Sequence, residues 1–326
     1  MKIAIVGCGA LGTYYGAKLC RAGQDVHFLL RSDYEAVRRN GVTVRGAKEE
    51  FNVRPICART PEEIGECDLV VIGLKTTAND QFAKLLPPVV GRHTAVLTLQ
   101  NGMGNEERLA QLFPPDQILG GLCFVCLNRV EPGVVRYIDH GLIVLGEFQR
   151  PAQTRTHEIA ALFQTAGVKC HVTEDLARAH WEKLVWNIPF NGLGVASAAG
   201  LEAFSSARVS PFTFQTAGPC LTTDKLLGDV RWEKLVRALM LEVIAAASAR
   251  GWVIPVAFAE KQIERTRTMG EYKPSTLVDF EAGRPLELES LFLDPLRQAV
   301  QAGVPAPRWE RLCRVLEQLD PRRAGS

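Results

Sequence analysis

The glycine-rich turn near the start of the chain constrains the fold more than any other feature. Residues 2–6 read KIAIV, an apolar run typical of a buried strand, and a segment with helical spacing begins at residue 13. Between them stands a GxGxxG sequence made by Gly7, Cys8, Gly9, Ala10, Leu11 and Gly12. The motif alone is a weak signal, but between a strand and a helix it is the fingerprint of a dinucleotide-binding βαβ unit. There the glycines permit a tight turn, a close approach of the pyrophosphate and close helix packing.

The rest of the first half repeats this alternation of strand and helix. β-rich runs at 67–75, 93–102 and 116–128 each end in turn residues or in a helical segment. The alternation predicts an α/β fold with a doubly wound, Rossmann-type parallel sheet. Two further β runs, at 134–138 and 142–147, suggest a hairpin added to that sheet.

The texture of the sequence changes after about residue 174. Strand patterns almost vanish, and helical spacing takes over at 175–198, 232–251, 255–268, 289–302 and 307–319. We therefore expect a nucleotide-binding domain over 1–174 and an all-helical domain over 175–326. The segment 204–220 carries two prolines and many small residues, which predicts an irregular insertion.

Charge and cysteine content exclude several classes of function. The 38 Lys and Arg residues balance 36 Asp and Glu residues, so no basic surface for nucleic acid is expected. No run of 18 apolar residues predicts a membrane span, and the N-terminus does not resemble a signal peptide. The nine scattered cysteines indicate reduced thiols, and Cys123 and Cys126 lack further ligands for zinc. We expect a cytoplasmic protein without a metal site.

The end of the second predicted strand indicates which cofactor binds. NAD enzymes usually place Asp or Glu there to bind the ribose 2′-hydroxyl, but this chain reads HFLLRS, with Arg31 and Ser32 in that place. An arginine pairs with a 2′-phosphate, which a carboxylate would repel. The sequence therefore predicts NADP(H) rather than NAD(H), with a plain surface arginine as the alternative.

Two later strand ends carry polar residues. Lys75 ends one β run and Asn101 ends the next. Ligands of open α/β sheets bind outside the carboxyl ends of the strands, so both residues are expected near the cofactor or the substrate. A solvated loop lysine is the alternative for Lys75.

The segment EKLVWNIPFN at 182–191 places one amine and two amides at steps of four residues. On a helix, Lys183, Asn187 and Asn191 form one polar stripe about 80° wide on an otherwise apolar surface. Asparagine is a poor helix former and an unusual choice for a solvent-facing stripe. Periodicity alone leaves open whether the stripe faces solvent or lines a pocket. Pro189 predicts a kink in the same helix.

Taken together, these motifs resemble the ketopantoate reductases over nearly the whole chain. The resemblance rests on GCGALG, Arg31, GLKT, QNGMGNEE at 100–107, HWEKLVWNIPFN at 180–191 and KPSTLVDFEAGRPLELESL at 273–291. It implies reduction of a small 2-keto acid, 2-dehydropantoate (ketopantoate), to pantoate by hydride transfer from NADPH to its C2 ketone. This reaction is a step toward pantothenate and coenzyme A.

The resemblance also implies roles for single residues. Lys183 matches the catalytic lysine, which stabilises the developing oxyanion and donates a proton to it. Asn187 and Asn191 match residues that hold the substrate's hydroxyl and neighbouring oxygens, and Ser275 matches a serine that binds its carboxylate. The active site is expected in the cleft between the two domains.

Three more positions match residues around the cofactor. Lys75 and Asn101 match positions that contact NADPH and border the substrate, and Glu287 matches an acid near the lysine, substrate and cofactor. Three other family-like residues are expected to pair or cap within the helical domain, namely Glu242, Asp279 and Arg284.

Departures from the family pattern keep alternatives open. Trp186, Pro189 and Leu286 stand where the family often has small residues or threonine, and 204–220 is longer than usual. A reductase of another 2-keto acid is therefore one alternative, and a β-hydroxyacid or opine-type dehydrogenase is another. A non-enzymatic NADP-sensing protein is the third. The helical faces suit a homodimer or a core equally well, so the oligomeric state stays open.

Overall fold

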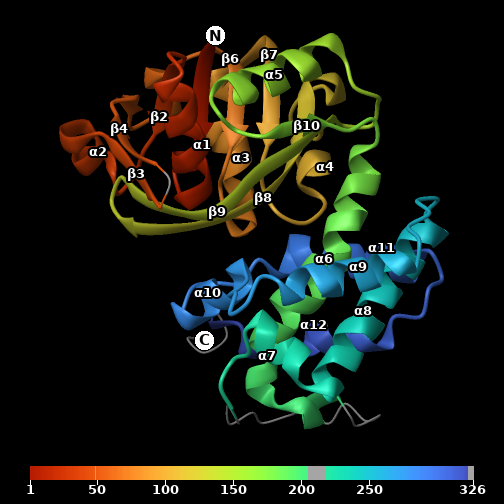
Figure 1. Ribbon diagram of the computed structural model, residues 1–326. Helices are drawn as coiled ribbons and strands as arrows, with labels where there is room; N and C mark the ends of the chain where they lie inside the picture. The colour runs from red at the N-terminus through yellow and green to blue at the C-terminus, as the bar shows by residue number, and fades with distance from the viewer. Residues whose placement is uncertain (48, 205–217, 322–326) are drawn as a thin grey trace. The chain divides into compact units, whose positions relative to one another are not determined.

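The computed structural model describes residues 1–47, 49–204 and 218–321 (Figure 1). The chain divides into two units, Met1–Ala179 and His180–Ser326. The division falls in the first turns of helix α6 (Leu176–Ala196). The sequence places the change from α/β to helical texture at 174/175, just before the same helix begins.

A ten-stranded mixed sheet forms the first unit, in the order β4-β3-β9-β8-β7-β6-β1-β2-β5, with β10 beside β9. The strands from β5 to β8 are parallel, whereas β9 runs antiparallel to β8, and β4 antiparallel to β3. The predicted Rossmann-type sheet is confirmed, with antiparallel strands added. The strands are β1 (Lys2–Val6), β2 (Asp25–Leu29), β3 (Val42–Gly46), β4 (Glu50–Val53), β5 (Ile56–Ala58), β6 (Cys67–Ile72), β7 (Val90–Thr98), β8 (Ile118–Glu131), β9 (Val134–Glu147) and β10 (Cys170–Val172).

Two separate apolar cores cover the two faces of this sheet. Ile3 and Ile5 of β1 join one core, whereas Ala4 and Val6 join the other, because successive side chains of a strand point to opposite faces. Helices α1 and α5 pack on the first face, and α3 and α4 contribute to the second (Figure 1). The helices of this unit are α1 (Ala10–Arg21), α2 (Tyr34–Asn40), α3 (Phe82–Leu85), α4 (Asn105–Leu109) and α5 (Thr154–Thr165).

The predicted hairpin at 134–138 and 142–147 is wrong. Both runs belong to the single 14-residue strand β9, which pairs with β8 across the turn at Gly133. His140 and Gly141 adopt left-handed conformations, with φ of 66° and 119°, where the register with β8 shifts between Phe124 and Val125. The bulge therefore uses the residue types of a turn without reversing the chain.

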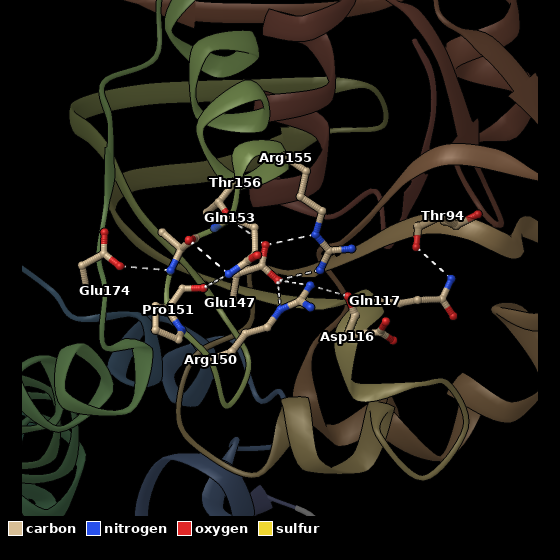
Figure 2. A network of polar contacts seen from close by, with 11 residues as sticks. Thr94, Asp116, Gln117, Glu147, Arg150, Pro151, Gln153, Arg155, Thr156 and Glu174 are labelled. Carbon is tan, nitrogen blue, oxygen red and sulfur yellow. Dashed lines mark hydrogen bonds and ion pairs between the residues drawn. The ribbon is translucent and has the colours of Figure 1, made fainter.

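A buried carboxylate joins β9 to α5. Glu147, the last residue of β9, accepts hydrogen bonds from Arg150 Nη2 at 3.0 Å, Arg155 Nη2 at 2.6 Å and Thr156 Oγ1 at 2.5 Å (Figure 2). Burial raises the pKa of Glu147, but the hydrogen bonds from Arg155 and Thr156 outweigh it, so the net pKa lies below its usual value. The cluster fixes the first turn of α5 against the sheet.

The described part of the second unit contains helices and no strand. The five helices predicted from periodicity are all present, and a π-helical turn, Glu289–Leu293, precedes α11. Two short helices, α7 and α10, were not predicted. Most of the predicted insertion at 204–220 lies outside the described residues. The helices are α6, α7 (Thr223–Gly228), α8 (Val230–Ala249), α9 (Ala257–Arg267), α10 (Ser275–Glu281), α11 (Asp294–Gln301) and α12 (Pro307–Leu319).

Two features are absent from the residues that the structure describes. None of their helices combines the length and hydropathy needed to span a bilayer. No group of three or more His, Cys, Asp or Glu side chains among them is arranged to hold a metal ion.

Candidate active site

Two of the three glycines in the first turn, Gly7 and Gly12, leave no room for a side chain, whereas Gly9 does. Gly7 has φ of 101°, and a Cβ atom there would lie 2.3 Å from the backbone nitrogen of Leu74. A Cβ at Gly12 would lie 2.2 Å from the Gly7 carbonyl oxygen, and one at Gly73 would lie 2.9 Å from the same oxygen. A Cβ at Gly9 would meet no atom within 4 Å. The open space at Gly9 fits a ligand that approaches the backbone.

The N-terminus of α1 begins at this open space. Gly9 is its N-cap, no side chain caps the helix, and its first turn contains no acidic residue. Amide groups at such a terminus, on a helix of 12 residues, favour an anion. Burial, and then the charge of Asp33, raises the pKa of the neighbouring Cys8 thiol, which therefore stays neutral beside that anion. The turn and helix end fit the pyrophosphate of a dinucleotide.

The segment after β2 presents an exposed cation, and the acid nearest to it in the sequence is paired with another residue. Arg31 is exposed and forms no ion pair with any residue that the structure describes. The first acid after the strand, Asp33, is buried. Its carboxylate accepts hydrogen bonds from Arg129 Nε at 3.0 Å, Gly133 N at 3.2 Å and Ser32 Oγ at 3.0 Å. Asp33 is thus neutralised by Arg129, and Arg31 stays open to an anionic ligand.

The loops after β6 and β7 carry Lys75, which is exposed, and Asn101, which is partly buried. Three buried amides, for which the sequence predicts no role, connect these loops. Gln100 Nε2 donates to the Leu74 carbonyl at 3.0 Å and to Asn79 Oδ1 at 2.8 Å.

A chain of hydrogen bonds, here called the amide relay, leads from these loops toward Asn101 through the side chains of Gln100, Asn79 and Asn105. Asn79 Nδ2 donates to Asn105 Oδ1 at 2.9 Å, and Asn105 Nδ2 donates to the Asn101 carbonyl at 3.1 Å. The relay therefore holds the backbone beside both predicted ligand contacts. The cluster of amides is visible in the sequence, but their partners are not.

On α6, the predicted polar stripe is largely buried. Asn187 and Asn191 are buried and Lys183 is partly exposed. Asn191 Nδ2 donates to Asn187 Oδ1 at 3.3 Å, as the four-residue spacing predicts. Asn191 Oδ1 accepts from Ser275 Oγ at 3.3 Å and from the backbone nitrogen of Thr276 at 3.1 Å. The structure thus joins Asn187, Asn191 and Ser275 in one hydrogen-bonded group.

The unusual residues within the same motif pack against other helices. Trp186 Nε1 donates to Thr266 Oγ1 at 2.8 Å, and its ring lies 5.0 Å from Phe190 and 6.2 Å from Tyr272, centroid to centroid. The α-helix continues through Pro189. Trp186 therefore braces α6 against α9 and the loop that follows it.

Glu287 is buried, with 7% of its surface exposed, and lies just before the π-helical turn Glu289–Leu293. Such turns are rare and are frequent at functional sites.

The three residues predicted to be structural are confirmed in that role. Arg284 Nε donates to Asp279 Oδ1 at 2.9 Å, which pairs the two charges at the end of α10. Glu242 accepts from the backbone nitrogens of Arg308 at 3.2 Å and Trp309 at 2.9 Å, which satisfies amide groups at the start of α12.

Comparisons with known proteins cover nearly the whole chain. The family model described as "Ketopantoate reductase PanE/ApbA" matches residues 3–150, and its C-terminal counterpart matches residues 213–320. A 2-dehydropantoate 2-reductase of Nostoc sp. is 41% identical over 98% of this chain and 96% of its own.

Two solved structures are also similar over their full length. The 2-dehydropantoate 2-reductase of Geobacter metallireducens is 47% identical, with a TM-score of 0.88 over 98% of this chain and 99% of that chain. The enzyme of the same description from Methylococcus capsulatus is 31% identical, with a TM-score of 0.87 over 100% and 99%.

Proposed function

The chain belongs to the ketopantoate reductase family, and on that premise we propose that it reduces 2-dehydropantoate to pantoate with NADPH. Membership makes it an oxidoreductase that acts on a CH–OH group with a nicotinamide cofactor. The choice of NADPH and the roles of single residues are the proposed part.

The observation that best supports NADPH as the cofactor is the contrast between the two charged residues Arg31 and Asp33 after β2. Arg31 is exposed without an ion-pair partner in the described chain, and Asp33 is buried against Arg129. A 2′-phosphate therefore meets a cation, and the carboxylate that would repel it is already neutralised. Gly9 and the uncapped start of α1 suit the pyrophosphate of the same molecule.

Lys183 is proposed as the proton donor of the reaction. When bound, the cofactor supplies a hydride to C2 of the ketone, and negative charge develops on the carbonyl oxygen. The Lys183 ammonium stabilises this charge and donates one proton to the oxygen, which completes the alcohol. Solvent then restores the proton to the lysine. The four-residue spacing aligns Lys183 with the asparagines of the stripe.

Asn187 and Ser275 are proposed to bind the oxygens of the substrate. Asn191 uses its carbonyl oxygen for Ser275 and Thr276 and one N–H for Asn187. The Asn187 amide nitrogen donates to no group of the described chain, which leaves it for a substrate oxygen. An uncharged amide provides this donor without adding charge near Lys183. The exposed Ser275 hydroxyl is proposed for the substrate carboxylate.

The proposal is tested by steady-state kinetics with NADPH and NADH, each against ketopantoate, pyruvate, 2-ketoisovalerate and oxaloacetate. We expect the highest kcat/KM for NADPH with ketopantoate. A higher kcat/KM for another acid would identify that 2-keto acid, and not ketopantoate, as the preferred substrate. A preference for NADH would overturn the role of Arg31. Tight NADPH binding without turnover on any acid would favour a binding protein.

A further inference from the structure

A second arginine follows the strand that neighbours β2. Strand β5 pairs with β2 in parallel, with Leu29 opposite Ala58, and the Leu30 backbone nitrogen donates to the Ala58 carbonyl at 2.9 Å. Arg59 is the next residue after β5, as Arg31 is the second residue after β2. Because parallel strands end at the same edge, both arginines belong to the edge where a nucleotide binds.

The Arg59 side chain is held over the segment that carries Arg31. Its guanidinium lies 4.0 Å from the centre of the Tyr34 ring and pairs with the carboxylate of Glu35, at the start of α2. Its backbone nitrogen donates to Glu63 Oε2 at 2.9 Å. The Tyr34 ring and the Glu35 carboxylate together hold the Arg59 guanidinium close to the segment that follows β2.

The ion pair between Arg59 and Glu35 is weak enough for a more strongly charged group to replace Glu35. The side chains of Arg59 and Glu35 are 52% and 63% exposed, and an exposed pair of this kind contributes little to stability. A phosphate carries more charge than a carboxylate and accepts hydrogen bonds from two guanidinium groups at once. The other acid of the segment, Asp33, is already paired with Arg129.

We propose that Arg59 is a second determinant of cofactor specificity, which exchanges Glu35 for the 2′-phosphate and binds it together with Arg31. This inference rests on the proposed use of NADPH. Glu35 acts as the resting partner of Arg59, and Tyr34 keeps the guanidinium in place during the exchange.

The decisive measurement is the dissociation constant of the full-length protein for NADPH, NADH, 2′,5′-ADP and 5′-AMP. We expect Arg59→Ala to weaken NADPH and 2′,5′-ADP by roughly 5- to 30-fold, as for one exposed charge-assisted contact. NADH and 5′-AMP should change by less than about twofold, because they lack the phosphate. Unchanged NADH binding also shows that the variant is folded.

Arg54→Ala is the matched control. Arg54 is an exposed arginine just before the amino end of β5, whereas Arg59 follows its carboxyl end. The control variant changes the net charge equally and should leave NADPH binding within about twofold of the wild type. Arg59→Lys should restore part of the lost affinity, and Glu35→Gln should strengthen NADPH binding by removing the competing carboxylate.

Two results would overturn the role of Arg59. One is an Arg59→Ala variant that keeps full affinity for NADPH, and the other is an equal loss for NADPH and NADH. A wild-type protein that binds NADH as tightly as NADPH would instead overturn the assignment of NADP(H) itself, before any variant is compared.

Discussion

Lys183 lies one helical turn before Asn187 on α6 and is partly exposed, whereas both asparagines of the stripe are buried. If its ammonium protonates the developing alkoxide, Lys183→Ala should lower kcat by roughly 10²–10⁴-fold. NADPH affinity, measured by fluorescence titration, should change far less. Lys261→Ala, an exposed lysine on α9, is the control and should keep wild-type turnover. Wild-type turnover in Lys183→Ala would reject the assignment.

The residues of the site differ in how far the sequence predicts them. The Asn187–Asn191 contact follows from a spacing of four on a helix, which is local information. Ser275 lies 84 residues from Asn191, so their contact depends on how α10 packs beside α6 and not on any local pattern. The amide relay is of the same kind, because an amide can donate or accept and its partner is set by the fold.

The connection between β9 and α5 contains the buried carboxylate of Glu147, and its stability should therefore depend on pH. Glu147 has a folded-state pKa below its ordinary value of 4.5. Its contribution is fully present above about pH 4.5 and is lost as the pH falls through the lower folded value. Glu147→Gln should lower the free energy of unfolding at pH 7 by roughly 1–3 kcal/mol, since Arg150 and Arg155 lose a charged partner.

Urea denaturation from pH 7 to pH 3 checks this expectation. The difference between wild type and Glu147→Gln should shrink as the pH falls. Glu158→Gln, an exposed position on the same helix, should differ little from wild type throughout. A difference for Glu147→Gln that stays constant with pH would show that shape, and not charge, accounts for the loss.

Long periodic elements were predictable and short or bent ones were not. The predicted helices α6, α8, α9, α11 and α12 each span at least two full turns, so helical spacing recurs in their sequences, whereas α7 and α10 span six and seven residues, less than two turns. The sequence pattern predicts two strands in place of β9 because His140 and Gly141, at the bulge, are turn-like residues. Periodicity reveals an element only where its pattern recurs. The two short helices and the bulge in β9 are too short for any pattern to recur.

The proposed ligand residues are divided between the two units of the molecule. The glycine turn, Arg31, Lys75 and Asn101 belong to Met1–Ala179, whereas Lys183, the two asparagines, Ser275 and Glu287 belong to His180–Ser326. The change of texture that predicts two domains is therefore also a change in the proposed chemistry, from cofactor binding to proton transfer.

Binding of NADPH should stabilise the whole chain against unfolding. A ligand that binds only the folded state adds about 2.7 kcal/mol at a concentration of 100 times its dissociation constant. We therefore expect the unfolding temperature, followed by scanning fluorimetry, to rise with the logarithm of NADPH concentration. NADH at equal concentration should give a smaller rise. Equal shifts for the two cofactors would contradict the NADP preference.

The three glycines that meet at the first turn limit how this sequence can drift over time. Gly7, Gly12 and Gly73 each exclude a side chain because a Cβ atom at any of them would lie within 3.0 Å of a backbone atom. Backbone atoms are the same in every amino acid, so no second mutation elsewhere can make room. A lineage that keeps this turn must keep all three glycines together. Gly9 has space around it, so the proposed cofactor would be the one constraint on that position, and a descendant that abandons the cofactor should lose Gly9 first.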